Sequence, residues 1–158
     1  LVGAGAAGKV ELAGFSAHSV EAALAAIGQF DVDSVLFPFN FVTDRVGGFG
    51  PQVIEAAGER GMACLALKAM AKCKRPQGAN RDEFPKCWYQ PVSDPELADM
   101  ALRFTLSQPL VAAIPPGELR LFDMALDIAS RFTPIEKREL DELLSIAKRQ
   151  EPIFALDP

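Results

Sequence analysis

The heptapeptide Asp33-Ser-Val-Leu-Phe-Pro-Phe39 is the stretch of sequence that decides the fold class. An apolar run of this kind is typical of a parallel strand that is covered on both faces. Because proline cannot donate a ladder hydrogen bond, we expect Pro38 at the carboxyl end of this strand. Helical patterns lie on both sides of the run, and alternation of apolar strands with helices predicts a parallel sheet.

Three further strands are expected along the chain, at residues 9–16, 62–68 and 110–114. Four strand–helix units amount to half of an eight-unit barrel, whereas a doubly wound sheet is the alternative that periodicity leaves open. Residues 40–50 and 69–93 are expected to be irregular, and loops as long as the second are usually functional. The first predicted helix begins at Ser16 or Ser19 and ends at Gly28. Four further helices are expected at residues 51–60, 94–108, 118–131 and 133–150.

Composition limits the classes of protein to which the chain can belong. Its 158 residues suffice for one domain, and 49% hydrophobic with 23% charged residues is typical of a globular protein. The net charge of −5 argues against nucleic-acid binding, and no apolar run is long enough to span a membrane. Three cysteines without a CxxC motif fit a reduced compartment, so we expect a cytoplasmic protein without a metal site. An export signal upstream of Leu1 stays open.

The glycines of Gly3-Ala-Gly5-Ala-Ala-Gly8 match the GxGxxG pattern of dinucleotide-binding folds. That motif requires a preceding strand and a following helix. Here the order is reversed, because the next element is predicted to be a strand. The glycines therefore indicate the end of a small-residue helix and a turn.

Four landmarks lie at the ends of the predicted strands: Gly14-Phe-Ser16 with His18-Ser19, Phe37-Pro-Phe-Asn40, Ala66-Leu-Lys68-Ala-Met70 and Ile114-Pro-Pro-Gly117. Their order and spacing resemble the C-terminal half of the aldo/keto reductases, NADP-dependent oxidoreductases built on a (β/α)8 TIM barrel. The resemblance covers residues 9–150 as strands five to eight. It implies that residues 1–158 are the C-terminal part of such a domain, present as a half-barrel whose N-terminal half is absent.

The resemblance also implies where the chemistry of the family would reside. The Asp, Tyr, Lys and His that transfer protons come from the first four strands, so we expect no catalytic residue in this chain. The C-terminal half supplies the cradle for NADPH. In that cradle Ser16 resembles the serine that contacts the nicotinamide carboxamide, and Asn40 is the nearest amide on the second strand.

Several positions depart from the family pattern. Ala17 replaces an asparagine, which leaves His18 or Ser19 as substitutes, and Pro38 replaces a glutamine. Leu67 stands where a tyrosine stacks on the nicotinamide. The residues of the last strand end that would hold the 2′-phosphate align with Pro116 and Gly117, and Lys68 takes a neighbouring serine position.

The candidate side chains have competing structural explanations. A lysine at the end of an apolar strand is costly to bury without a partner, so Lys68 is expected to pair with a phosphate, a substrate carboxylate or a carboxylate of the absent half, unless it extends to solvent.

Ser16 can cap a helix instead of binding an amide, and the helix dipole disfavours the charged form of His18. Arg120 begins a helix whose free N–H groups form an anion site, although Glu118 beside it would repel an anion. Lys72, Lys74 and Arg75 can clamp a pyrophosphate or form a solvated loop, and Trp88-Tyr89 is expected to pack that loop onto the barrel rim. The predicted cofactor-binding residues are Ser16, His18, Asn40, Lys68, Pro116, Gly117 and Arg120.

The sequence thus predicts the C-terminal portion of an NADPH-dependent reductase of aldehydes or ketones, inactive by itself. The alternative is a non-catalytic half-barrel that dimerises and binds a ligand or partner. Either would expose two open sheet edges, so we expect poor stability or self-association until the missing half or a second copy covers them.

Overall fold

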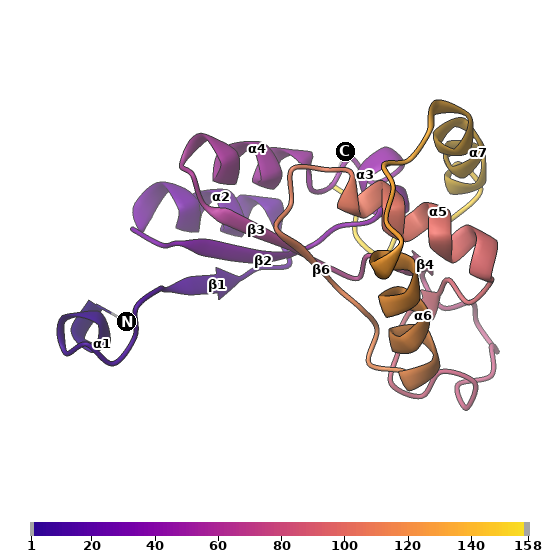
Figure 1. Ribbon diagram of the computed structural model, residues 1–158, viewed down its shortest axis with the longest axis horizontal. Coiled ribbons are helices and arrows are strands. Elements are labelled where there is room, and N and C mark those ends of the chain that lie inside the picture. Colours follow the sequence, from indigo (N-terminus) through magenta and orange to yellow (C-terminus); the bar gives the residue numbers. More distant parts are fainter. Residues whose placement is uncertain (1, 157–158) are drawn as a thin grey trace.

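A computed structural model describes residues 2–156 and contains a four-stranded parallel sheet. The strands lie side by side in sequence order, as in a segment of a βα barrel and unlike a doubly wound sheet, whose order reverses at a switch point (Figure 1). Pro38 is the last residue of its strand, as predicted, and pairs with Leu67. The strands are β1 (Gly14–Ser16), β2 (Ser34–Pro38), β3 (Ala63–Leu67) and β6 (Ala112–Ile114).

The predicted helices form close to their expected bounds. Ser19, and not Ser16, caps α2 by accepting a hydrogen bond from the N–H of Ala22 at 3.2 Å. Asp94 caps α5 in the same way, and Pro95 is its first residue. Gly28 does not end α2, which continues through Gln29. The helices are α2 (Val20–Gln29), α4 (Pro51–Glu59), α5 (Pro95–Leu106), α6 (Leu119–Ser130) and α7 (Lys137–Ala147).

Three regions differ from the sequence-based expectation. The first strand is shorter, since only Gly14–Ser16 pair with β2 and residues 9–13 do not form a strand. The segment 40–50, expected as a loop, contains the helix α3 (Phe41–Arg45). The long segment 69–93 contains a small antiparallel sheet of β4 (Ala71–Cys73) and β5 (Gln90–Pro91). At the start, α1 (Val2–Ala6) and the turn at Gly8 (φ 64°) agree with the predicted small-residue helix end.

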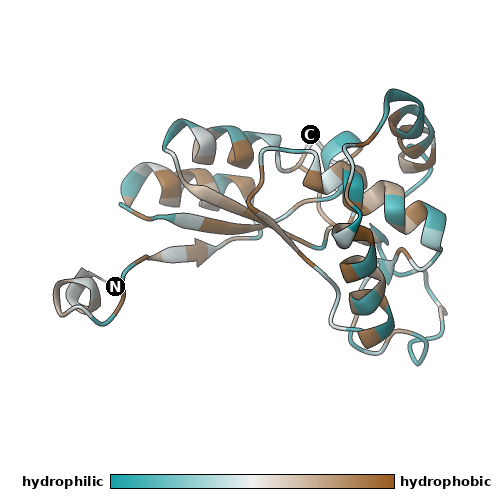
Figure 2. Ribbon diagram, in the orientation of Figure 1, coloured by the Kyte–Doolittle hydropathy of each residue, from teal (hydrophilic) through white to brown (hydrophobic). Residues whose placement is uncertain are grey.

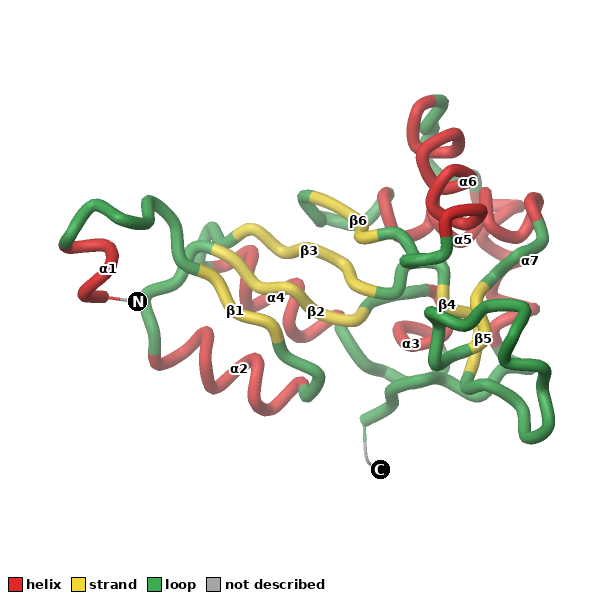
Figure 3. Tube along the Cα trace, turned by 90° about the horizontal axis from the view of Figure 1, so that it is seen from below, coloured by secondary structure: helices red, strands yellow, loops and turns green. Residues whose placement is uncertain are grey.

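Helices cover only one face of the sheet. Val35 and Phe37 of β2 are buried on the covered face, as are their β3 partners Cys64 and Ala66. The alternate residues of β3, such as Leu65, are only half-buried. In Figure 1, α2 and α4 lie above the sheet, and Figure 3 shows the same strands from the opposite side, in front of α4. Within residues 2–156 the lower face of this sheet is thus less covered than the upper face, although parallel sheets are normally covered on both faces.

Hydrophobic residues also reach the surface at both sheet edges. In Figure 2 the strands are coloured as mainly hydrophobic, and the exposed side of α7 as hydrophilic. Leu12, before edge strand β1, is 71% exposed, and Val111, before edge strand β6, is 70% exposed. The short helix α1 lies away from the rest of the molecule beyond β1 (Figure 1). The open edges that the sequence predicted are therefore present in the structure.

A buried arginine joins the helices α5 and α7. Arg103 of α5 is bonded to the carboxylates of Asp99, at 3.0 Å, and Glu139 of α7, at 2.7 Å. It also donates to the backbone carbonyls of Thr133 (2.8 Å) and Pro134 (2.9 Å). A planar guanidinium satisfies such a set of acceptors at once, so this residue fixes α7 against α5.

Candidate functional site

The carboxyl ends of the four parallel strands lie along one edge of the sheet. In βα barrels this edge carries the active site. It is formed by Ser16 after β1, Asn40 after β2, Lys68 after β3 and the segment 115–117 after β6. The structure thus brings most of the predicted site residues to a single edge of the sheet.

Asn40 has a structural role that the sequence did not reveal. Its side chain is 1% exposed, and its Oδ1 accepts hydrogen bonds from the N–H groups of Val42 and Thr43, both at 3.0 Å. Thr43 returns the contact through its hydroxyl, which completes a capping box at the start of α3. The Asn40 Nδ2 donates to the carbonyl of Lys68 at 3.2 Å. This amide therefore connects the ends of β2 and β3.

Lys68 has an unusual backbone conformation. Its φ of 62° makes it the non-glycine residue with a positive φ within residues 2–156. For a residue with a Cβ the left-handed region costs about 1 kcal/mol or more. The carbonyl of Lys68 accepts hydrogen bonds from the amide of Asn40 and from the N–H of Ala71 at 2.9 Å. These contacts hold the strained residue in place.

The Lys68 side chain lies against an aromatic cluster. Its Nζ is 5.7 Å from the centroid of the Trp88 ring, a distance at which an ammonium is attracted to the ring face. Burial lowers the pKa of this half-buried ammonium. The ion pairs found among residues 2–156 do not include Lys68. Lys68 is therefore a partly desolvated cation without a bonded carboxylate in the part of the chain that the structure describes.

His18 approaches the same cluster from the end of β1. Its ring is 5.7 Å from that of Phe154, whose ring in turn lies 6.0 Å from the indole of Trp88. Burial lowers the pKa of His18, and the nearby charge of Lys68 lowers it further. The structure thus places both predicted basic residues of the strand ends beside one pair of aromatic side chains.

Phe154 is the residue of this cluster that sequence reasoning missed. It lies beyond α7, where no predicted element pointed to the site, and the N–H of Leu156 anchors the segment to the carbonyl of Gly47 at 2.9 Å. Its ring also stacks on Phe49 at 5.3 Å. The apolar run Ile153-Phe-Ala-Leu156, after the charged residues of α7, was the available signal.

Ser16, Pro116 and Gly117 lie at the two open ends of the row. The Ser16 side chain is exposed at the end of edge strand β1. Pro116 is buried, whereas Gly117 is exposed and leaves room for a Cβ, whose nearest neighbour would be the Lys86 Cδ at 3.9 Å. Packing therefore does not require a glycine at position 117.

Arg120 contacts the long loop. Its guanidinium donates to the carbonyl of Glu83 at 3.1 Å and lies 5.1 Å from the ring of Phe84. Glu118, the first residue before α6, accepts a hydrogen bond from the N–H of Lys86. Both polar side chains at the start of α6 thus hold the loop.

Two other basic residues of the loop, Arg75 and Lys74, are also engaged. Arg75 donates to the carbonyls of Asn80 and Phe84, both at 3.1 Å, and of Cys87. Lys74 pairs with Glu151 at 2.7 Å. Arg75 therefore organises the loop from within.

Tyr89 is buried, as expected of a residue that packs the loop, whereas Trp88 is 57% exposed. No group of three potential metal-binding side chains occurs among residues 2–156. In the same part of the chain, no helix is both long and apolar enough to cross a membrane.

Comparison with known proteins supports this architecture at the level of structure. Neither the protein-family models nor the curated proteins match the sequence. The fold is similar to that of aldo-keto reductase AKR11C1 from Bacillus halodurans, with a TM-score of 0.59 for the holo form and 0.58 for the apo form. Sequence identity is 15% in both cases. The alignments cover 95% of this chain but only 55% and 56% of the two reductase chains. The chain thus has an aldo-keto reductase-like fold and spans about half the length of these neighbours.

Proposed function

We propose that this chain is the C-terminal, cofactor-binding part of an aldo/keto reductase-like oxidoreductase that reduces an aldehyde or ketone with NADPH. The observation that carries the proposal is the sequential four-stranded parallel sheet, which aligns with a reductase barrel over 95% of the chain. The strand ends of such a barrel are the place where catalytic and binding groups gather.

The residues at the strand ends fit part of a dinucleotide site. Ser16 offers an exposed hydroxyl at the end of β1, which suits a carboxamide. Lys68 and His18 supply cationic or donor groups at the same edge of the sheet, and the Gly117 backbone is open to solvent. NADPH, when bound, supplies the hydride. The residues of this chain would orient the cofactor and exclude water from one side.

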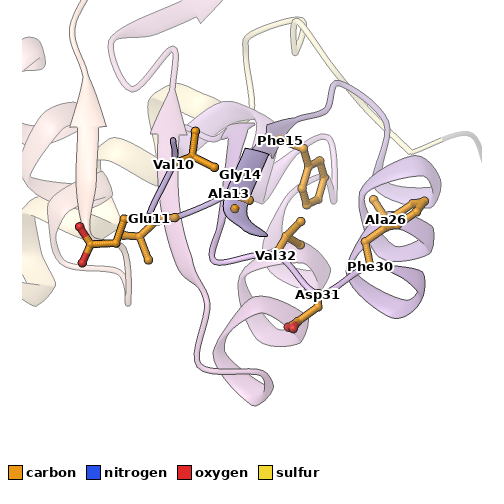
Figure 4. Close-up of a pocket in the computed structure, with 11 residues that line it drawn as sticks. Val10, Glu11, Ala13, Gly14, Phe15, Ala26, Phe30, Asp31 and Val32 are labelled. Atoms are coloured by element: carbon orange, nitrogen blue, oxygen red, sulfur yellow. The ribbon is translucent and has the colours of Figure 1, made fainter. Parts of the chain in front are cut away.

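Proton transfer would come from the remainder of the barrel. We infer that the partner of this chain is the complementary half, because a little under half of the AKR11C1 chain has no counterpart here. An apolar groove of about 440 Å³ along the open side of β1 is the place where this half would continue the sheet. Figure 4 shows Phe15 of β1 and Val32 lining this groove together with Ala26 and Phe30 from α2 and its end.

A second function has specific support. Arg120 and Asn40 are engaged in contacts within the chain, and the sequence resemblance implies that Leu67 stands where a reductase would stack a tyrosine on the nicotinamide. A half-barrel that pairs with a second copy and binds a ligand without redox chemistry accommodates these facts. In that protein the same strand ends would bind an anionic ligand.

The test is NADPH binding, measured by fluorescence titration of the nucleotide with the 158-residue chain and with the longest natural protein that carries it. We expect the longer protein to bind NADPH and to reduce a panel of aldehydes, and the chain alone to show no turnover. Ser16→Ala should weaken binding roughly threefold to tenfold, the scale of one hydrogen bond. The matched control is Ser145→Ala on the exposed side of α7. Ligand binding without any affinity for NADPH in either protein would favour the non-catalytic half-barrel.

A further inference from the structure

We propose that Lys68, His18 and Trp88 form a binding site for an oxyanion, and that this oxyanion is the carboxylate of the substrate. As a statement about substrate class, the inference rests on the proposed reductase function. As a statement about a binding site, it stands on the contacts of these residues alone.

The position of the ammonium is the first observation. Lys68 Nζ lies 5.7 Å from the Trp88 ring centroid, at the edge of the sheet where barrel active sites form. An indole face attracts the cation but accepts none of its three N–H donors in the way that a carboxylate does. Because no carboxylate within residues 2–156 pairs with Lys68, its charge-assisted hydrogen bonds are left for a ligand.

The backbone of Lys68 is the second observation. A glycine at φ 62° would avoid the steric cost that lysine pays there. The strained conformation is maintained by two hydrogen bonds to the Lys68 carbonyl, one of them from the buried side chain of Asn40. Strain that a structure maintains in this way is a feature of ligand sites. In this protein the strained backbone conformation of Lys68 is the one in which its side chain reaches the ring of Trp88.

The surroundings of the ammonium favour a singly charged group. The neighbours that the structure gives Lys68 are aromatic or histidine side chains: Trp88, Phe154 beside it and His18. One ammonium flanked by rings matches one carboxylate with an apolar chain. A pyrophosphate, with two or more charges, is more often bound by several backbone N–H groups at a helix start. At α6 the N-cap residue is Glu118, whose carboxylate accepts a hydrogen bond from the N–H of Lys86 and would repel an anion.

Trp88 provides a direct readout, because it is the single tryptophan of the chain. We would titrate the 158-residue chain with butyrate and with butyramide, its neutral isostere, at constant ionic strength, and follow the fluorescence of Trp88. We expect a saturable change with butyrate and none with butyramide. Lys68→Met should weaken butyrate binding by at least about tenfold, since a charge-assisted hydrogen bond contributes on this scale.

The control variant is Lys137→Met, which removes an exposed lysine at the start of α7 and should leave the titration unchanged. Equal responses of the wild type and the Lys68→Met variant, or no response of the wild type, would overturn the proposal. Inorganic phosphate is titrated in parallel. If phosphate binds at Lys68 more than tenfold tighter than butyrate, the oxyanion belongs to a phosphate and the assignment to a carboxylate is wrong.

A comparison of two aldehydes, one with a carboxylate and one without, tests the substrate class in the active enzyme. Succinic semialdehyde and butanal have chains of the same length and differ in the carboxylate. In Lys68→Met the ratio of the KM for succinic semialdehyde to the KM for butanal should rise about tenfold, because only the first substrate loses an ion-paired hydrogen bond, and this ratio is independent of any effect on NADPH affinity. A loss of NADPH affinity with both KM values unchanged would refute the carboxylate assignment. Because the Trp88 titration needs neither NADPH nor turnover, failure of the reductase proposal would be seen separately.

Discussion

Replacement of Arg103 by methionine should destabilise the protein more than any comparable surface change. The substitution keeps the apolar stem but removes five hydrogen bonds, to Asp99, to both oxygens of Glu139 and to two backbone carbonyls. Breaking a buried ion pair costs about 3–5 kcal/mol when the remaining charge has no other partner. Here Asp99 keeps Arg131 at 2.7 Å, and Glu139 keeps the N–H of Glu136 at 2.8 Å.

The expected loss therefore lies at the low end of that range, about 3 kcal/mol in the free energy of unfolding. For a domain of this size the corresponding decrease in Tm is about 6–12 °C. The assay is urea unfolding followed by circular dichroism, with Arg131→Met as the control. Arg131 is 55% exposed, so its loss should destabilise the protein much less than the loss of Arg103. Equal destabilisation by the two substitutions would refute the reasoning.

The same contact predicts a pH dependence. The hydrogen bond from Arg103, followed by that from the backbone of Glu136, lowers the pKa of Glu139 below its usual range. A carboxyl with a lower pKa in the folded state stabilises the protein above its unfolded-state pKa, and this contribution is lost as pH falls through the folded-state value. Unfolding measured from pH 7 to pH 3 should show a weaker decline in the Arg103→Met variant than in the wild type.

Three further outcomes are expected. Asn40→Ala should lower stability by about 2 kcal/mol in thermal unfolding, because it removes a helix cap and a buried hydrogen bond, whereas Asn40→Ser, whose hydroxyl can still cap the helix, should lose less. Gly47→Ala should loosen the terminal segment in hydrogen exchange, since its Cβ would lie 2.4 Å from the carbonyl oxygen of Phe154, while Gly28→Ala, with open space around it, should not. Burial raises the pKa of the Cys64 thiol to about 11, so iodoacetamide at pH 8 should modify this residue in urea but very slowly in the folded protein.

The sequence contained enough information to predict the sheet, since its apolar runs and caps are local signals. The segment Asp33–Phe39 identified a parallel strand, and Asp94-Pro95 marked the start of α5. Residues 9–13 fail to extend β1 because a strand needs a partner, which is not a property of its own sequence. The strands β4 and β5 were missed for the same reason, since sixteen residues separate them and no hairpin turn joins them.

The candidate site was predicted in outline. Position at a strand end follows from sequence order, so Ser16, Asn40 and Lys68 could be placed on one edge. What a side chain contacts there depends on distant segments. The carbonyl of Lys68 that receives the Asn40 amide, and the ring of Phe154 beside His18, are brought in by tertiary packing. Asn40 is a favourable N-cap residue, but Thr43 is not the Glu or Gln of the usual capping-box signature, so α3 was not predicted.

The order of the strands has a consequence for protein engineering. Because each strand pairs with its neighbour in sequence, the proposed half-barrel could be exchanged as a cassette of residues 14–156, which keeps α7 and Phe154 packed on the core. A chimaera would join them to the first four units of another barrel through new ladders at β1 and β6 alone. The chimaera would close only if both halves share the strand tilt of about 36° to the barrel axis and the stagger in hydrogen-bond register of an eight-stranded barrel. Libraries of such hybrids would show which donor halves the exposed hydrophobic layer accepts, and ligand selectivity could then be exchanged together with the cassette.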